Sequence, residues 1–298
     1  MTRWLPTCII VPGMLALTAT GGAAQPATLE AQLARERVDT LLHTAHGQHV
    51  DVMVTQGKHF RCMSFDRRNY FQSCMHKAQP QVLVLEYTRG LVAGLRFLDR
   101  APQNMLLVGL GGGSIPKAVL QHFPQARLDV VEIDPVVVQT ARDWFGLQSS
   151  DRLHIATVDA RVFVRQALNR DQRYDLIMLD AFDNEYVPEH LLTVEFLQQV
   201  SRLLTRDGIV AANTFSRGRL RAHEEATWQA VFPHLLRSRR YDNDILYAAH
   251  VPMQARVEDR LLDQVTGPWP QLAVVTPSPA RPLTDQWSPT NLLRDRHD

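Results

Sequence analysis

The chain has 298 residues, of which 45% are hydrophobic and 21% are charged, and its formal net charge is +1. That length is enough for one large domain and one small domain with a sizeable core, and the composition is that of an ordinary globular protein. A net charge so close to zero gives no bulk electrostatic basis for binding nucleic acid or an anionic membrane, and we expect neither as a partner. We interpret the short run of Arg237, Arg239 and Arg240 as a solvated face.

Residues 1–24 have the layout of a secretory signal peptide. Arg3 precedes an apolar run from Cys8 to Leu17, and small residues follow, with Gly22 and Ala24 at the −3 and −1 positions of a cleavage site. The apolar run is too short to cross a membrane as a helix. We therefore expect a periplasmic or secreted mature chain without a membrane span, or a cytoplasmic protein if the signal is not used.

Residues 25–85 predict an N-terminal helix followed by a small β domain. Apolar side chains recur at helical spacing between Thr28 and Thr44, which predicts a helix there. The stretch His49–Met75 alternates polar and apolar residues, as a β-meander does. A second helix is predicted over Leu83–Leu98, where it leads into the main domain.

Two cysteines of this β domain are candidates for a disulfide. The strand-like runs Lys58–Phe65 and Tyr70–Met75 flank a turn, and if the turn centres on Arg68, residues whose numbers sum to 136 face each other. Cys62 and Cys74 satisfy that sum. We therefore expect either a cross-strand disulfide, which suits an oxidising compartment, or two buried free thiols.

Residues 86–255 alternate strand and helix patterns, and their near-continuous apolar strands predict a parallel sheet covered by helices on both faces. The expected strands are Met105–Val108, Leu128–Ile133, Leu153–Val158, Leu176–Leu179, Gly208–Asn213 and a late antiparallel Ile245–Val251. The expected helices are Ser114–His122, Pro135–Phe145, Arg161–Leu168, Leu192–Leu204 and Glu224–Leu236. Residues 256–298 are expected to form a C-terminal helix and a Pro-rich tail.

Three strand ends of this domain predict a nucleotide site. The glycine-rich segment GLGGGS, residues 109–114, lies between a strand and a helix, where Gly109, Gly111 and Gly113 let the backbone approach a ligand. Glu132 ends the next strand and can accept hydrogen bonds from both hydroxyls of a ribose, and Asp159 ends the third strand near the expected adenine. Ligands of open α/β sheets bind at these carboxyl ends.

A second pair of acids predicts the reacting end of the site. Asp180 ends the central strand, and Asp183 follows in the next loop. Two carboxylates placed so can hold a cationic amine and accept a proton from it. The structural alternatives remain open: the glycines form only a tight turn, Asp134 and Asp159 act as helix caps, and Asp183 belongs to an acidic turn.

A metal site is not expected. His43, His46 and His49 recur every three residues, but Gly47 interrupts the helix that would place them on one face. No Cys stands close by to complete a ligand set.

These residues resemble the spermidine synthase (polyamine aminopropyltransferase) family, over roughly residues 49–215 and again near residues 283–285. The resemblance implies a class I S-adenosylmethionine methyltransferase-like Rossmann domain of the α/β class, with a mostly parallel seven-stranded sheet, preceded by a small N-terminal β domain. The matching residues are the glycine motif 108–113, Glu132 for the ribose, Asp159 and Ala160 for the adenine, Asp180 and Asp183 of the family's Asp-Ser-Ser-Asp motif, Gln72, and Tyr87.

The resemblance also implies the reaction. Asp180 would be the catalytic residue, and Asp183, Tyr87 and Gln72 would bind the acceptor, a small amine. Decarboxylated S-adenosylmethionine, or S-adenosylmethionine itself, would be a co-substrate, with no tightly bound cofactor. The small β domain could pair edge to edge in a homodimer.

The sequence departs from the family at three positions: two that are acidic in the family, and one that follows an aspartate. The aspartate of the family's glycine loop is Gly112, the glutamate of its Tyr-(His/Gln)-Glu motif is Arg89, and the proline after the second aspartate is Asn184. Losing two acids disfavours a polycationic acceptor. Two other functions therefore stay open: an S-adenosylmethionine-dependent methyltransferase, and an exported nucleotide- or polyamine-binding protein without turnover.

Overall fold

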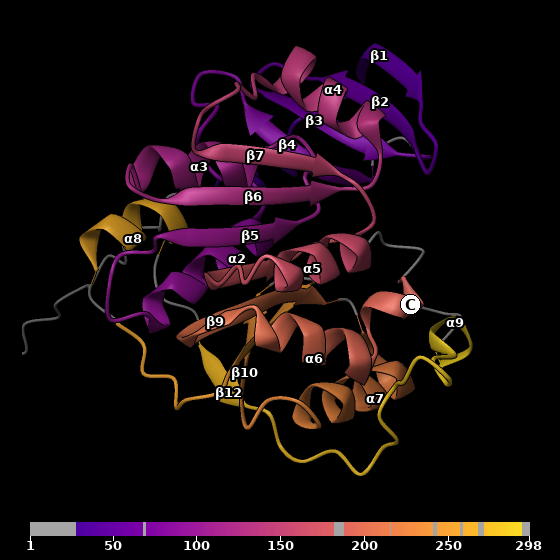
Figure 1. The fold of residues 1–298 in the computed structure, drawn as a ribbon. Coiled ribbons are helices and arrows are strands. Elements are labelled where there is room, and N and C mark those ends of the chain that lie inside the picture. The colour runs from indigo at the N-terminus through magenta and orange to yellow at the C-terminus, as the bar shows by residue number, and fades with distance from the viewer. Residues whose placement is uncertain are drawn as a thin grey trace, which may run out of the picture.

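The computed structural model describes residues 28–67, 70–181, 188–214, 216–240, 243–256, 259–267 and 271–293. The expected signal peptide and Asp183 lie outside the described residues. The chain forms a four-stranded sheet, with strand order β1-β2-β3-β4, and an eight-stranded sheet, with order β12-β10-β11-β9-β8-β5-β6-β7. Figure 1 shows the small sheet at one end of the large one, next to helix α4. Of the helices in these ranges, none is long and apolar enough to cross a membrane.

The small β domain contains one more strand than expected. Its elements are α1 (Leu29–Leu33), β1 (Thr40–His46), β2 (Asp51–Gln56), β3 (Phe60–Phe65) and β4 (Phe71–His76), and adjacent strands are antiparallel. The predicted helix over 28–44 is therefore wrong beyond Leu33. Pairing of β1 with β2 overrides the helical spacing of the apolar residues, because such local preferences are weak beside tertiary contacts.

A disulfide joins Cys62 of β3 to Cys74 of β4, with their Cα atoms 4.1 Å apart. The expected register holds from Phe60, which faces His76, as far as Met63, and then shifts at a bulge. Both cysteines are buried in a cluster with residues of α1 and of the segment that leads into the main domain.

The large sheet follows the predicted alternation. Its parallel strands are β5 (Asn104–Val108), β6 (Arg127–Glu132), β7 (Leu153–Thr157), β8 (Tyr174–Leu179) and β9 (Leu204–Thr214). Its antiparallel strands are β10 (His234–Arg240), β11 (Asn243–Ala249) and the short β12 (Leu272–Val274), which is an eighth strand beyond the seven expected. The helices are α2 (Glu86–Ala93), the 3-10 turn η1 (Gly94–Phe97), α3 (Ser114–His122), α4 (Pro135–Phe145), α5 (Ala160–Asn169), the 3-10 turn η2 (Glu189–Leu191), α6 (Val194–Arg202), α7 (Gly218–Gln229), α8 (Arg260–Thr266) and α9 (Thr290–Leu293).

The central strands are buried on both faces because their side chains alternate between two apolar clusters. Met105 and Leu107 of β5 join the cluster that contains residues of α2, α3 and α8. Leu106 and Val108 join the opposite cluster, with residues of α5, α6 and α7. In Figure 1, α5 and α6 cover the near face of the sheet. This two-sided burial is the property that predicts a parallel sheet from an apolar run.

Two expectations for the later part of the chain are wrong. The helix predicted over 224–236 is α7, which ends at Gln229, and His234 already begins β10. Pro233 lies between them, and a proline cannot continue a helix without losing a hydrogen bond. Arg237 is not solvated: only 3% of its side chain is exposed, and it forms ion pairs with Glu225 at 2.9 Å and with Asp244 at 2.7 Å.

The β domain is fixed against α4 and the residue that precedes it. Val52 and Val54 of β2 pack on Val137 and Phe145 of α4 in a buried cluster. The carboxylate of Asp134, just before α4, accepts hydrogen bonds from the backbone N–H of His49 at 2.8 Å and of Val136 at 2.9 Å. Asp134 is therefore the expected helix cap, and it also joins the β1–β2 turn to the carboxyl end of β6.

The disulfide predicts a stability difference that can be measured. Replacing Cys62 and Cys74 together by alanine should lower the free energy of unfolding by about 3 kcal/mol, because the cross-link no longer restricts the unfolded chain. Urea unfolding of the two proteins measures the difference. Wild-type protein held in dithiothreitol is the matched control, since it keeps both side chains and loses only the bond. Equal urea midpoints for oxidised and reduced wild type would contradict this account.

Candidate active site

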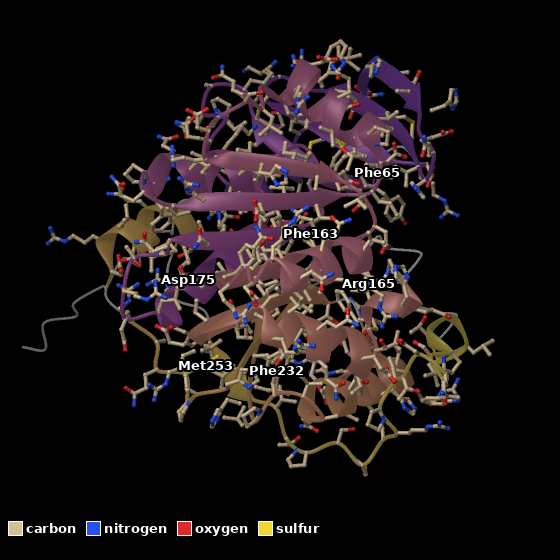
Figure 2. The ribbon with its side chains drawn as sticks, in the orientation of Figure 1. Phe65, Phe163, Arg165, Asp175, Phe232 and Met253 are labelled. Atoms are coloured by element: carbon tan, nitrogen blue, oxygen red, sulfur yellow. A yellow bond between two sulfur atoms is a disulfide. The ribbon has the colours of Figure 1, made fainter. Side chains whose placement is uncertain are left out.

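A cavity of about 820 Å³ opens at the carboxyl ends of the parallel strands, between the large sheet and the β domain. Figure 2 labels Phe65, which lines the cavity, at this edge of the sheet, and Asp175 toward the opposite edge. The predicted residues that line the cavity are Gln72, Tyr87, Gly109, Gly111, Glu132, Asp159, Ala160 and Asp180. Gly113 does not line it; this residue instead precedes α3 as the N-cap.

The glycine loop is held against Asp180. Gly109 has a φ of 97°, and a Cβ atom there would lie 2.2 Å from the carbonyl oxygen of Asp180. Only glycine avoids both the strain and the clash. The next residue, Leu110, donates its backbone N–H to the carboxylate of Glu132 at 3.0 Å. The end of β5 is thus fixed by the ends of both neighbouring strands.

Glu132 holds the loop and faces the cavity. Its side chain is 9% exposed, and its second oxygen accepts the backbone N–H of Asp134 at 3.1 Å. Burial raises the pKa of this carboxyl above its ordinary value, although the backbone donors oppose that shift. An acid that ends this strand and faces the cavity is in the position of one that accepts hydrogen bonds from ribose hydroxyls.

Asp159 has two roles at the third strand end. One oxygen caps α5 by accepting the backbone N–H of Val162 at 3.1 Å. The other lies 3.0 Å from Nε2 of His190, and both side chains line the cavity. The helix-cap interpretation is therefore correct for one oxygen only. His190 was not predicted, because it follows Asp159 by 31 residues and no local pattern connects them.

Asp180 is the titratable group best suited to chemistry. Burial raises the pKa of its carboxyl to about 7, while a hydrogen bond from Asn213 and the nearby Tyr87 hydroxyl lower it and the charge of Glu132 raises it. The side-chain amide of Asn213 donates to Oδ1 of Asp180 at 2.9 Å. A pKa near neutrality leaves the group able both to accept and to release a proton at physiological pH.

Tyr87 and Gln72 connect Asp180 to the β domain. The hydroxyl of Tyr87, on α2, donates to the backbone carbonyl of Gln72, on β4, at 3.0 Å. Burial raises the pKa of Tyr87 well above its ordinary value, and the charges of Asp180 and Glu30 add to the shift. Tyr87 is therefore a neutral hydroxyl beside the Asp180 carboxylate.

Two acids of the cavity wall were missed from the sequence. Glu30 comes from α1 and accepts the backbone N–H of Glu86 at 2.8 Å, and the side chains of both glutamates line the cavity. Arg89, where the family has its glutamate, is absent from the lining: it donates to the carbonyl of Leu83 and pairs with Glu86 at 3.3 Å. Arg89 therefore neutralises Glu86 from outside the lining, and Glu30 supplies negative charge to the cavity.

Gly112 is enclosed. A Cβ atom there would lie 2.9 Å from Cδ1 of Phe145 and 2.9 Å from Oγ of Ser73. Both neighbours are buried, so neither can move freely aside. The aspartate that the family carries at this position cannot stand here without repacking.

The three spaced histidines do not converge. His43 stacks on Trp144, His46 lies 3.0 Å from Asp51, and the backbone of His49 donates to Asp134. Within the part of the chain that the structure describes, no group of three His, Cys, Asp or Glu side chains is arranged to hold a metal ion.

The fold and the cavity together define a protein of the methyltransferase-like α/β class. The sequence model of the spermine/spermidine synthase domain matches residues 85–227. The chain is 35% identical to the polyamine aminopropyltransferase of Vibrio vulnificus over 275 residues, which make up 86% of this chain and 92% of that protein. The chain therefore belongs to the spermine/spermidine synthase family, as its motifs predict.

Two further relatives show how widely the fold is shared. The eEF1A lysine and N-terminal methyltransferase of Mus musculus is 33% identical over 230 residues, which cover 72% of this chain but only 32% of that protein. The crystal structure of a probable spermidine synthase from Corynebacterium glutamicum matches with a TM-score of 0.65 and 22% identity, covering 86% of this chain and 96% of that chain. The second likeness confirms the predicted fold class.

The glycine loop yields a prediction with a matched control. Gly109→Ala should weaken binding of S-adenosyl ligands at least about tenfold, because the new methyl group must push the loop away from Asp180. Gly146 also has a positive φ, 69°, but a Cβ atom there meets nothing within 4 Å. Gly146→Ala should therefore cost only about 1 kcal/mol of stability and leave binding unchanged. Calorimetric titration measures both; equal affinities in the two variants would contradict the assignment.

Proposed function

We propose that the protein transfers an aminopropyl group from decarboxylated S-adenosylmethionine to a small amine. The observation that carries the proposal is Asp180, a carboxyl of pKa about 7 placed between the glycine loop and Tyr87 in an acid-lined cavity. Similarity to the polyamine aminopropyltransferase of Vibrio vulnificus over most of both chains supports the same reaction.

The reaction is an in-line displacement at carbon. The donor lies along the glycine loop, with its ribose on Glu132 and its adenine near Asp159. The acceptor nitrogen attacks the carbon beside the sulfonium, the carbon–sulfur bond breaks, and its electron pair passes to sulfur, which leaves as neutral methylthioadenosine. Asp180 accepts the proton that the amine loses. Because the sulfonium is already a good leaving group, the protein contributes chiefly alignment and proton removal.

The acceptor is a cation, and the cavity supplies negative charge for it. Glu30 and Glu86 line the wall, and Glu30 lies near enough to raise the pKa of Tyr87. Because Glu86 is paired with Arg89, Glu30 is the carboxylate that replaces in part the acids that the family carries in its glycine loop and tyrosine motif. We therefore propose a polyamine or diamine acceptor, bound through Asp180, Tyr87 and Gln72, with Asp183 in the same role.

Methyl transfer is a second candidate, and the packing around Gly112 favours it. No acid can stand at this position without repacking, so a donor that keeps its carboxylate meets no repulsion there. The 33% identity to a methyltransferase of Mus musculus agrees with that possibility. The same cavity and the same displacement would then move a different carbon.

The products distinguish the candidates. Purified protein is incubated with each nucleotide together with putrescine or spermidine: methylthioadenosine supports aminopropyl transfer, and S-adenosylhomocysteine supports methyl transfer. Binding without either product indicates a binding protein, and no binding of either nucleotide refutes the nucleotide site and both transferase functions. Asp180→Asn should lower kcat about 100-fold or more, because it removes the proton acceptor. The matched control is Asp151→Asn, an exposed carboxylate outside the cavity, which should keep full activity.

We further propose that the mature chain is exported, on two grounds: the signal-like residues 1–24 and the buried disulfide between Cys62 and Cys74. Disulfides persist in oxidising compartments and are rare in the cytosol. Expression of the full chain in a bacterium should yield periplasmic protein whose first residue is Gln25, identified by mass spectrometry. Cytoplasmic protein that retains residues 1–24 would refute the export.

A further inference from the structure

A line of side-chain amides leads to Asp180. Asn213, near the end of β9, is 1% exposed and donates its Nδ2 to Oδ1 of Asp180 at 2.9 Å. Its own carbonyl oxygen accepts Nδ2 of Asn243, the first residue of β11, at 3.1 Å. Strands β9 and β11 are paired neighbours, and all three side chains line the cavity.

The Asp180 carboxylate sets the donor-to-acceptor direction of these two hydrogen bonds. An ionised carboxylate can only accept hydrogen bonds, so Asn213 must turn its NH₂ group toward Asp180. That orientation leaves the oxygen of Asn213 facing Asn243, which must then donate. Each amide thus confirms the orientation of the next, and burial of Asn213 allows no alternative partner from bulk water.

We propose that Asn213 and Asn243 are positioning residues that hold the Asp180 carboxylate in its ionised form, with one oxygen occupied and the other turned toward the acceptor. Since Oδ1 accepts the hydrogen bond from Asn213, Oδ2 is the oxygen that we assign to the amine. The proposal rests on the proposed function, in which Asp180 takes a proton from the acceptor.

The hydrogen bond from Asn213 determines in which direction a substitution should move the pKa of Asp180. Donation from Asn213 lowers the pKa of Asp180, whereas burial raises it. Removing the donor should therefore raise the pKa, and a larger share of the protein would carry a protonated, inactive Asp180 at neutral pH. The rise of kcat/KM with pH, which reports the free protein, should move to higher pH.

The other charged groups around Asp180 are the same in every variant. Tyr87 of α2 and Glu132 of β6 interact with it directly, and Glu30 of α1 acts on it through Tyr87. Glu86 and Arg217 also line the cavity. A shift seen on changing either asparagine is therefore due to the amide line.

The test compares Asn213→Ala and Asn243→Ala with Asn169→Ala, an exposed amide at the end of α5. In wild type, kcat/KM for the amine should rise with a midpoint near 7, the pKa of Asp180. Asn213→Ala should move the midpoint up by about one pH unit and lower kcat about tenfold, because it removes a hydrogen bond to a charged group. Asn243→Ala should also move the midpoint to higher pH and should lower kcat about threefold, because it acts only through Asn213. Asn169→Ala should leave both the midpoint and kcat unchanged.

Two further measurements distinguish a change at Asp180 from damage to the cavity or a failure of the proposed function. Donor affinity, measured by calorimetry, should stay within about twofold in all three variants, which shows that the cavity is intact. Titration of the Asp180 carboxyl by ¹³C NMR needs no turnover, so it tests the amide line even if wild type transfers nothing and the proposed function fails. An unchanged Asp180 titration in Asn213→Ala, with donor binding retained, would overturn the proposal.

Discussion

The close approach of Gly109 to the main chain of Asp180 is the constraint on which the site depends. Strands β5 and β8 are adjacent and parallel, so their ends arrive side by side, and a residue with any side chain at 109 would push them apart. That contact places the loop expected to carry the donor directly against the residue expected to take the proton. Glu132 then fixes the loop from the other side through Leu110. The glycine loop, Glu132 and Asp180 therefore form one packed unit.

The acids of the cavity are redistributed rather than lost. The glycine loop carries Gly112, and the charge of Arg89 is directed to Glu86 and the carbonyl of Leu83. Negative charge comes instead from Glu30, which is contributed by a helix that precedes the β domain. The electrostatic requirement of a cationic acceptor can thus be met from different positions, provided that the carboxylates face the same space.

Local patterns predicted the features that depend on local chemistry. Glycines between a strand and a helix, acids at strand ends, and the pairing of Cys62 with Cys74 all follow from spacing along the chain. Glu30, His190 and Asn243 could not be found this way, because each reaches the site through contacts between segments far apart in sequence. The same limit explains β1, whose pairing with β2 overrides helical spacing, and Arg237, whose burial depends on partners from α7 and β11.

Strand β4 of the β domain packs against the glycine loop. Ser73 of β4 lies against the positions of Gly111 and Gly112, and the hydroxyl of Ser114 is within 3.5 Å of the carbonyl of Cys74. The loop is thus closed by a strand that belongs to the other sheet. The α/β domain is therefore not a separable module: cut away from the small sheet, it would retain every glycine and acid of the motif yet expose the underside of the loop to water. A fragment that starts after β4 would therefore lose the contacts of Ser73 and Cys74 with this loop.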